Sequence, residues 1–387
     1  MNASEQFCPN LACCARGKIG QGNIVVHGRK RPRYKCKTCG RTFSAKTGTT
    51  FAGLRKPTAL IVIVVTLLSY GCPLQAIVHA FGLDERTVAA WRDRAGSHCQ
   101  QVHQAMVEQG KLDLLHVQAD EIRVKARGKI AWMGLAMMVS TRLWLAGVVS
   151  QTRDSTLADH LLQQVRRCSQ KMCALLLCTD GWAAYPNSIK RAFREKIKRT
   201  AGRGRCALEV WPDLHIGTVI KRTVNKRLKE VIRQMAHGNL EQALKLLGYS
   251  KGGKMLNTSF IERLHATMRE RLAALTRKCR HASSQLHAFH TGMYLIGCTY
   301  NFCWVHHELS KPVEKGGLGM SCTPAMASGL TNHIWSVFEL LSYKVAPPPL
   351  PIPKQRGRPR TKPLPDPTVP KRPRGRPRKE AVCSTTG

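Results

Sequence analysis

Residues 174–182 read Ala-Leu-Leu-Leu-Cys-Thr-Asp-Gly-Trp. The apolar run from Ala174 to Cys178 has no polar alternation, which predicts a strand that is buried on both faces. Asp180 stands at the C-terminal end of this strand and Gly181 follows it directly, at the edge where sites form in open α/β sheets. The stretch therefore predicts an α/β fold with a carboxylate at the carboxyl edge of its sheet.

The residues before this strand contain further strand and helix patterns that belong to the same domain. We expect this domain to span residues 112–340. Residues 112–124 read as a strand that leads to Asp120 and Glu121. Apolar runs then continue as in a β-meander, and a stretch with helical periodicity follows them. The two runs and the helix lie at residues 132–140, 143–150 and 156–169.

A third carboxylate stands farther along the chain, in a basic helix. Residues 257–259 read Asn-Thr-Ser, which are types that cap helices, and they predict a helix over residues 260–278. Glu262 falls in the first turn of this helix. Arg269, a candidate DNA contact, lies two turns later on the same face.

Carboxylates are scarce in this chain, which has 23 Asp and Glu against 62 Lys and Arg. If Asp120, Asp180 and Glu262 meet, they could hold two divalent cations about 3.5–4 Å apart, which activate water or a 3′-hydroxyl for phosphodiester attack. Such hard oxygen ligands favour Mg²⁺ or Mn²⁺. Each acid taken alone also fits a structural role, as a strand-end residue, a turn former or a charge at a helix N-terminus.

Residues 1–50 predict a small zinc-stabilised module. Cys8 and Cys13 form one close pair, Cys36 and Cys39 form another, and two such pairs fit a tetrahedral Zn²⁺ site. Cys14 is a rival to Cys13, which gives the shorter spacing; reduced structural thiols are the alternative to a metal. The module has too little apolar surface to fold alone, so the metal would supply folding free energy. Its crowded cations predict phosphate contacts: Arg29, Lys30, Arg31, Arg33, Lys35 and Lys37.

Residues 55–110 predict a helix-turn-helix for DNA binding. Helices are expected over residues 59–69, 74–81 and 85–104, with Asp84 as the cap of the third. The third helix would lie in the major groove. An ordinary three-helix packing unit is the alternative. The residues expected near the groove are Arg86, Thr87, Trp91, Arg92 and Arg94.

The formal net charge of +39 predicts a polyanionic partner, and the basic tail over residues 347–387 predicts a second DNA contact. The tail is rich in Pro and Arg and cannot bury a core, so we expect it to be disordered when free. It repeats one pentapeptide that resembles an AT-hook, which would bind A·T-rich minor groove; a generic polybasic tail is the alternative. The expected contacts are Arg356, Gly357, Arg358 and Arg360, and then Arg374, Gly375, Arg376 and Arg378.

The start of the chain predicts a cytoplasmic, nucleoid-associated protein. Residues 1–7 are polar and have no apolar segment of the kind that secretory signals contain. The longest apolar run, residues 59–68, is half the length that a membrane span needs, so no membrane partner is expected. Sixteen Cys without a signal favour a reducing compartment.

The residues quoted above resemble the DDE transposases of bacterial insertion sequences, in particular those similar to insertion sequence one. The resemblance covers about residues 8–310. Residues 8–44 resemble the zinc ribbon of these enzymes. Asp120-Glu121 resembles their first catalytic block. Residues 179–185 (Thr-Asp-Gly-Trp-Ala-Ala-Tyr) resemble the second. The third block is similar to residues 257–263 (Asn-Thr-Ser-Phe-Ile-Glu-Arg) and to the later Arg269, Arg271, Leu275 and Arg277.

This resemblance implies an RNase H-like catalytic domain in a transposase that cleaves DNA at element ends and joins the 3′-hydroxyl to a target strand. It implies that Asp120, Asp180 and Glu262 are the metal-binding catalytic residues, and that the protein acts as a homo-oligomer when two ends meet. Two other classes stay open: a catalytically inactive DNA-binding or regulatory protein derived from a transposase, and a structural chromatin-like protein.

The sequence departs from the family pattern in two places. Asp180 and Glu262 are 82 positions apart, a longer interval than many DDE enzymes have. An insertion of basic helices over about residues 223–247 would explain it, and Glu230 or Glu241 could then be the third ligand. His265 stands where relatives often have Asn.

Overall fold

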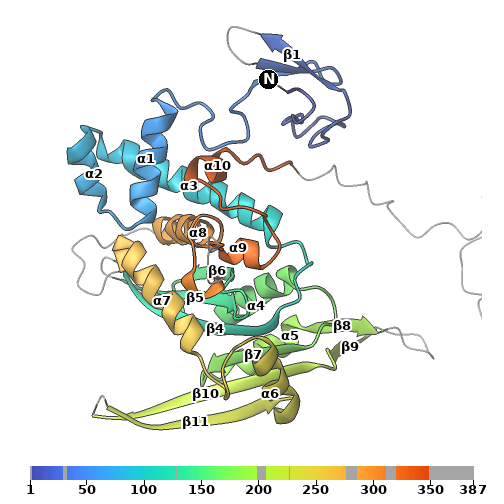
Figure 1. Cartoon of the computed structure of the whole chain (residues 1–387), viewed down its shortest axis with the longest axis vertical. Coiled ribbons are helices and arrows are strands. Elements are labelled where there is room, and N and C mark those ends of the chain that lie inside the picture. The colour runs from blue at the N-terminus through green and yellow to red at the C-terminus, as the bar shows by residue number, and fades with distance from the viewer. Residues whose placement is uncertain are drawn as a thin grey trace, which may run out of the picture. The chain divides into compact units, whose positions relative to one another are not determined.

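The computed structural model describes most of the chain in one unit, Met1–Pro348 (Figure 1). The tail motifs over residues 356–378 lie outside the described residues, as do three basic residues of the N-terminal module, Arg29, Lys30 and Arg31. No helix within the described ranges has the length and apolar character needed to cross a membrane. The described residues are 2–28, 33–126, 129–197, 206–225, 227–275, 286–310 and 320–347.

A mixed sheet forms the centre of the fold, with the strand order β11-β10-β7-β4-β5-β6 among the described residues. Three central strands, β4 (Leu115–Ala126), β7 (Leu175–Asp180) and β10 (Leu214–Val224), run parallel. β7 is buried except at Asp180, so the expected buried strand is confirmed. β5 (Lys129–Met138) and β6 (Trp144–Ser150) are antiparallel and complete the expected meander after β4. β11 (Arg227–His237) is also antiparallel and forms a hairpin with β10.

Helices cover both faces of this sheet, and two glycines mark which helix lies on which face. Gly134 of β5 lies against α4 (Ser155–Cys168), since a Cβ there would be 3.2 Å from Leu161. Gly147 of β6 lies against Met293 of α8 (Leu286–Phe302). Gly147 pairs with Leu135, the neighbour of Gly134, so the two glycines face opposite sides of the sheet. α5 (Ala184–Ala192) packs beside α4, while α6 (Leu240–Tyr249) and α7 (Ser259–Arg271) also contact the sheet.

Three helices precede the sheet, α1 (Thr58–Ser69), α2 (Leu74–Phe81) and α3 (Glu85–Met106), close to the expected bounds. Asp84 accepts a hydrogen bond from the Thr87 amide at 3.2 Å, which confirms the expected cap. The expectation that Trp91 lies at a DNA groove is wrong, because this side chain is only 4% exposed and belongs to the core.

The rest of α3 is mainly a packing helix. A Cβ at Gly96 would come within 2.1 Å of the Thr291 carbonyl oxygen, so α3 and α8 are in close backbone contact. Arg92 pairs with Asp93 at 2.8 Å, and Asp93 accepts a hydrogen bond from Thr291. Arg86 is exposed at the start of the helix. Along most of its length, α3 therefore packs against other helices, as expected for a three-helix packing unit.

The basic helices expected over residues 223–247 are not the observed structure. Residues 227–237 form β11, which pairs with β10 in an antiparallel hairpin, and the helix α6 begins only at Leu240. Cross-strand pairs such as Ile220 with Ile232 stabilise the hairpin, and pairing of this kind overrides local helix propensity. The helix α7 ends at Arg271, so the expectation of a helix to residue 278 is too long within the described residues.

The N-terminal module contains a three-stranded antiparallel sheet of β1 (Ile24–Gly28), β2 (Arg33–Cys36) and β3 (Thr42–Ser44). Its small core contains Ile24, Tyr34 and Phe43 together with three of the cysteines. The remaining described elements are short: β8 (Arg194–Ile197), β9 (Ala207–Val210), η1 (Ala273–Leu275), η2 (His307–Leu309), α9 (Pro324–Ala327) and α10 (Val337–Ser342).

Candidate functional site

Four cysteine sulfurs of the N-terminal module lie within 4.8 Å of one another, those of Cys8, Cys13, Cys36 and Cys39. The Sγ–Sγ distances are 3.6 Å for Cys8–Cys39 and 4.0 Å for Cys13–Cys36. A tetrahedral Zn²⁺ with Zn–S bonds of 2.3 Å requires about 3.8 Å between sulfurs, so the group fits zinc. Cys14 is exposed, which supports Cys13 as the fourth ligand.

The second candidate site begins where β4 and β7 end side by side. Ala119 pairs with Thr179 in parallel register, so Asp120 and Asp180 are the next residues on adjacent strands. Carboxylate oxygens of Asp120, Glu121 and Asp180 lie within 4.8 Å of one another. Sheet topology therefore brings together two acids that are 60 positions apart in the sequence.

Asp120 and Glu121 approach this group from opposite faces of the sheet. Asp120 pairs with Leu135 and so points to the side of α8, whereas Glu121 pairs with Gly134 and points to the side of α4. The Tyr185 hydroxyl donates a hydrogen bond to Glu121 Oε2 at 2.8 Å, and Arg153 forms an ion pair with Oε1. Glu121, with a side chain that is 2% exposed, is therefore already held by protein groups.

Arg153 contacts a second acid of the group as well as Glu121. Its guanidinium also lies 3.4 Å from Asp180 Oδ2 and 4.6 Å from the centre of the Trp182 ring. Cations stack favourably over indole rings, so Trp182 helps to hold the arginine in place.

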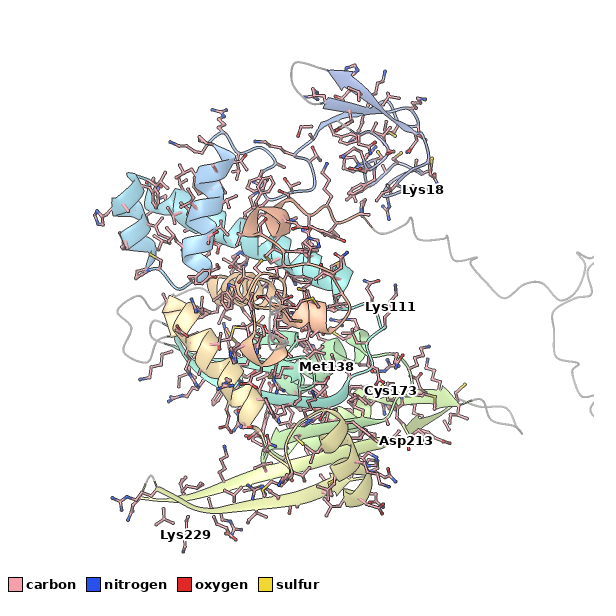
Figure 2. All side chains as sticks on the ribbon, in the orientation of Figure 1. Lys18, Lys111, Met138, Cys173, Asp213 and Lys229 are labelled. Carbon is pink, nitrogen blue, oxygen red and sulfur yellow. The ribbon has the colours of Figure 1, made fainter. Side chains whose placement is uncertain are left out.

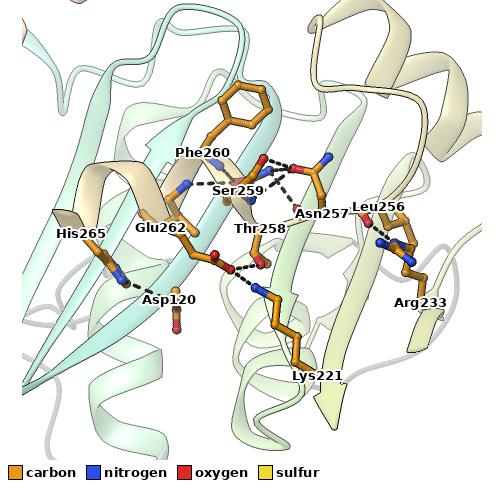
Figure 3. A network of polar contacts seen from close by, with 12 residues as sticks. Asp120, Lys221, Arg233, Leu256, Asn257, Thr258, Ser259, Phe260, Glu262 and His265 are labelled. Atoms are coloured by element: carbon orange, nitrogen blue, oxygen red, sulfur yellow. Dashed lines mark hydrogen bonds and ion pairs between the residues drawn. The ribbon is translucent and has the colours of Figure 1, made fainter. Parts of the chain in front are cut away.

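Glu262 lies on the opposite side of the same cavity, which has a volume of about 530 Å³ and is lined also by Asp120 and Asp180. Its carboxylate accepts a hydrogen bond from the Thr258 hydroxyl at 2.8 Å and pairs with Lys221 of β10 (Figure 3). Three predicted acids thus line one cavity, but Glu262 is not within the 4.8 Å group that Glu121 joins.

The other candidates for a third ligand lie elsewhere. Glu230 is exposed on β11 and pairs with Arg222 at 3.3 Å. Glu241 pairs with Lys245 on α6 at 2.8 Å. Neither residue lines the cavity, so the geometry favours Glu262 over both.

A buried glutamine ties the two sides of the cavity together. Gln118 of β4 donates hydrogen bonds to the carbonyl and side-chain oxygens of Asn257, at 2.9 and 3.1 Å. Its Oε1 accepts from the amides of Phe260 and Ile261, both at 3.0 Å, in the first turn of α7. Because Gln118 is two residues from Asp120, these bonds set the position of Glu262 relative to the sheet.

The electrostatics of the cavity favour a bound cation. Burial, and then the charges of Asp180 and Glu121, raise the pKa of Asp120 to about 7. Burial and Asp180 also raise the pKa of Glu121. Although burial raises the pKa of Glu262, hydrogen bonds from Lys221 and Thr258 lower it overall. Clustered carboxylates of this kind are relieved by a divalent ion with oxygen ligands, so the residues fit Mg²⁺ or Mn²⁺.

His265 of α7 lies beside Asp120, with Nδ1 at 3.6 Å from Oδ2. Burial, and then the charge of Arg269, lower the pKa of His265 to about 3, so its imidazole is neutral near pH 7. The histidine therefore adds no positive charge to the group of acids.

Sequence reasoning missed several residues of the site because their roles depend on tertiary contacts. Glu121 could have been singled out because it is a second acid directly after Asp120. However, side chains alternate along a strand, so the two acids were expected on opposite faces of the sheet and not in one group. Tyr185 ends the stretch of residues 179–185 that resembles the second catalytic block, but no role was expected of it. The others, Gln118, Arg153 and Lys221, carry no motif that would mark them.

In comparisons with known proteins, no protein-family model and no curated protein matches the chain. The resemblance to transposases therefore rests on the motifs themselves. The arrangement of the two ligand groups is the independent observation from which a function can be argued.

Proposed function

We propose that this protein is a DNA transposase that binds the ends of an insertion element and catalyses metal-dependent strand cleavage and strand transfer. The observation that carries the proposal is the placement of three carboxylates around one cavity. Asp120 and Asp180 end adjacent parallel strands, and Glu262 lies opposite them. All three acids and their neighbours resemble the motifs of the family in which such carboxylates bind the catalytic metal.

The fold supports the same proposal. A three-stranded meander, β4-β5-β6, is followed by parallel strands β7 and β10 on the other side of β4, with helices between them. This arrangement is consistent with the RNase H-like domain that the resemblance implies. It also explains how residues 120 and 180 become neighbours, while α7 brings the third acid from outside the sheet.

The protein groups of the cavity have distinct tasks in this proposal. Divalent cations bound there would activate the attacking oxygen and stabilise the leaving oxygen. Asp120 and Asp180 would hold them from the sheet, and Glu262 from α7. Lys221 and Arg153 line the same cavity, and their charges are suited to bind the oxygens of a phosphodiester.

The other expected parts serve DNA binding in the same proposal. The four cysteines would hold Zn²⁺ and fold the N-terminal module, whose cations contact phosphate. Arg86 at the start of α3 and the repeated tail motifs would add contacts to element ends and to A·T-rich DNA. Synapsis of two ends would require a homo-oligomer, acting at the nucleoid in the cytoplasm.

The test is strand cleavage and strand joining on DNA taken from the borders of the gene, with Mg²⁺ or Mn²⁺ supplied. Wild type should cleave and join strands, whereas Asp180→Asn and Glu262→Gln should do neither. Glu241→Gln is the matched control, because this carboxylate lies outside the cavity and pairs with Lys245 on α6. Equal activity of wild type and Asp180→Asn would reject the catalytic assignment.

One observation favours a second candidate, an inactive DNA-binding or regulatory protein. Lys221 forms an ion pair with Glu262, so a protein cation already balances the third carboxylate. Under this alternative, wild type and Asp180→Asn would bind DNA equally and neither would cleave it with either metal.

A further inference from the structure

The hairpin of β10 and β11 runs on beyond the sheet that it belongs to (Figure 1). β10 pairs with β7 only from Leu214 to Val219, and Val219 lies opposite Asp180. Both strands of the hairpin continue past this point to the turn between Val224 and Arg227. The four strand residues from Lys221 to Val224 correspond to about 14 Å, so the projecting part extends past the end of β7 by that length.

No core stabilises this projecting part, which we call the hairpin arm (residues 221–230). Its described residues, 221–225 and 227–230, are all exposed. An isolated two-stranded hairpin is only marginally stable in water. Ordering these residues costs conformational entropy, and the arm buries no apolar surface that would offset this cost. A contact with a partner therefore explains the arm better than a role in stabilising the fold.

The charge of the arm indicates what that partner is. Residues 221–230 contain five Lys and Arg but a single acid, Glu230. Among the described cations, Lys229 stands on the hairpin in Figure 2, and Arg222, Arg227 and Lys229 are exposed. Such a row of cations suits a regularly spaced polyanion, and a DNA strand presents one phosphate about every 3.4 Å.

A second copy of the chain fits the arm less well. β11 is an edge strand among the described strands, and edges can pair with another chain. However, Lys and Arg on an edge strand repel the same strand of another copy, and proteins use such charges to block that pairing. The exposed apolar residues Val224 and Leu228 are two isolated positions within this basic surface.

The arm begins at the cavity itself. Lys221, its first residue, pairs with Glu262 and lines the cavity together with Asp120 and Asp180. A duplex whose scissile phosphate lies at these carboxylates would therefore continue past the arm. We propose that the hairpin arm binds the sugar-phosphate backbone of duplex DNA next to the cavity and so orients the strand that enters it. This inference rests on the proposed function for the identity of the ligand, but its test does not need catalysis.

The test measures binding of the full, zinc-loaded chain to a fluorescein-labelled duplex of mixed sequence, without added Mg²⁺ or Mn²⁺, as a function of salt. The arm variant Arg222→Gln/Arg227→Gln/Lys229→Gln removes three exposed cations. We expect the slope of log affinity against log salt to become less steep by about 2–3, because each phosphate contact contributes about 0.9. The control variant Lys111→Gln/Lys171→Gln/Lys196→Gln removes three exposed cations from other surfaces and should change the slope by less than about 1.

Hydrogen exchange of the same complexes locates the contact. Peptides covering residues 221–231 should be protected when the duplex binds wild type, and this protection should be lost in the arm variant. Equal slopes for the arm and control variants, or unchanged exchange of the arm on DNA binding, would overturn the inference. A protein that fails to cleave DNA but shows the arm effect would reject the catalytic proposal alone, so the two failures are distinguishable.

Discussion

The two ligand groups of this protein are assembled in different ways. The sulfur group forms within residues 8–39, where two close pairs of cysteines meet across a small sheet. The three acids that line the cavity come from separate elements, Asp120 and Asp180 from adjacent strands and Glu262 from the helix α7. The first site is therefore a local structure that a metal can fold, and the second depends on a scaffold that must already be folded.

This difference separates what a metal does at each site. Zinc would supplement the small core of the N-terminal module, where metal binding and folding are coupled. A divalent ion at the carboxylates would relieve repulsion in a cavity that sheet and helices build without it. Loss of metal should therefore unfold the first region and only inactivate the second.

The largest expected effect is on the N-terminal module. Removing zinc with a strong chelator should unfold residues 2–44, since structural zinc contributes about 10–16 kcal/mol in small modules. Hydrogen exchange should show loss of protection there and unchanged protection in β4 and β7. Cys36→Ser should mimic the chelator, whereas Cys14→Ser, a change at an exposed thiol, should retain zinc. Zinc retention by Cys36→Ser would contradict the assignment.

The next effect separates two adjacent acids on opposite faces. Asp120→Asn should lower the rate of strand cleavage about 1,000-fold, which corresponds to about 4 kcal/mol. Glu121→Gln should lower it only about tenfold, because Tyr185 and Arg153 already hold that carboxylate. Single-turnover cleavage rates with Mg²⁺ measure both. A Glu121→Gln enzyme as impaired as Asp120→Asn would show that Glu121 is a ligand in its own right.

A smaller effect tests the link between the two sides of the cavity. Gln118→Leu should destabilise the domain by about 2–4 kcal/mol, because the amides of Phe260 and Ile261 lose a buried acceptor. Cleavage should fall with it while zinc content stays the same. Urea unfolding measures the stability, and Gln101→Leu on the exposed side of α3 is the control, with an expected change below about 0.5 kcal/mol. Equal stability of the two variants would exclude this positioning role.

The smallest expected effect is a loss of folding stability at low pH, caused by His103 in the core of the domain. Burial, and then the charge of Arg167, lower the pKa of His103 to about 4, against 6.5 for the exposed group. The folded state therefore favours neutral His103, so stability is lost as the pH falls below 6.5 and the loss is complete below 4. At pH 5 the cost is about 2 kcal/mol.

His103→Leu should remove this part of the acid sensitivity, whereas the exposed His160→Gln should leave it intact. Urea unfolding at pH 7 and pH 5 compares the variants. The same pH dependence in wild type and His103→Leu would show that other groups cause the acid sensitivity.

The local parts of this molecule could be predicted from the sequence, and the parts that depend on distant pairing could not. The run before Asp180, the cap at Asp84 and the spacing of the cysteines each carry their signal within a few residues. Residues 223–237 were expected to be helical, but they form the outer end of β10 and all of β11, whose cross-strand pairs override local helix propensity. Arg153 and Gln118 escaped notice, and Glu121 was named without an expected role in the site, since the roles of these residues come from contacts between elements.

The central claim is that Asp120 and Asp180 bind a divalent ion in a scaffold that folds without it. The most direct measurement is titration of the zinc-loaded protein with Mn²⁺, with free Mn²⁺ followed by electron paramagnetic resonance. Wild type should bind Mn²⁺, and Asp120→Asn/Asp180→Asn should lose that binding while its zinc content stays unchanged and its unfolding transition is not lowered. Equal binding of Mn²⁺ by wild type and the double variant would contradict the claim.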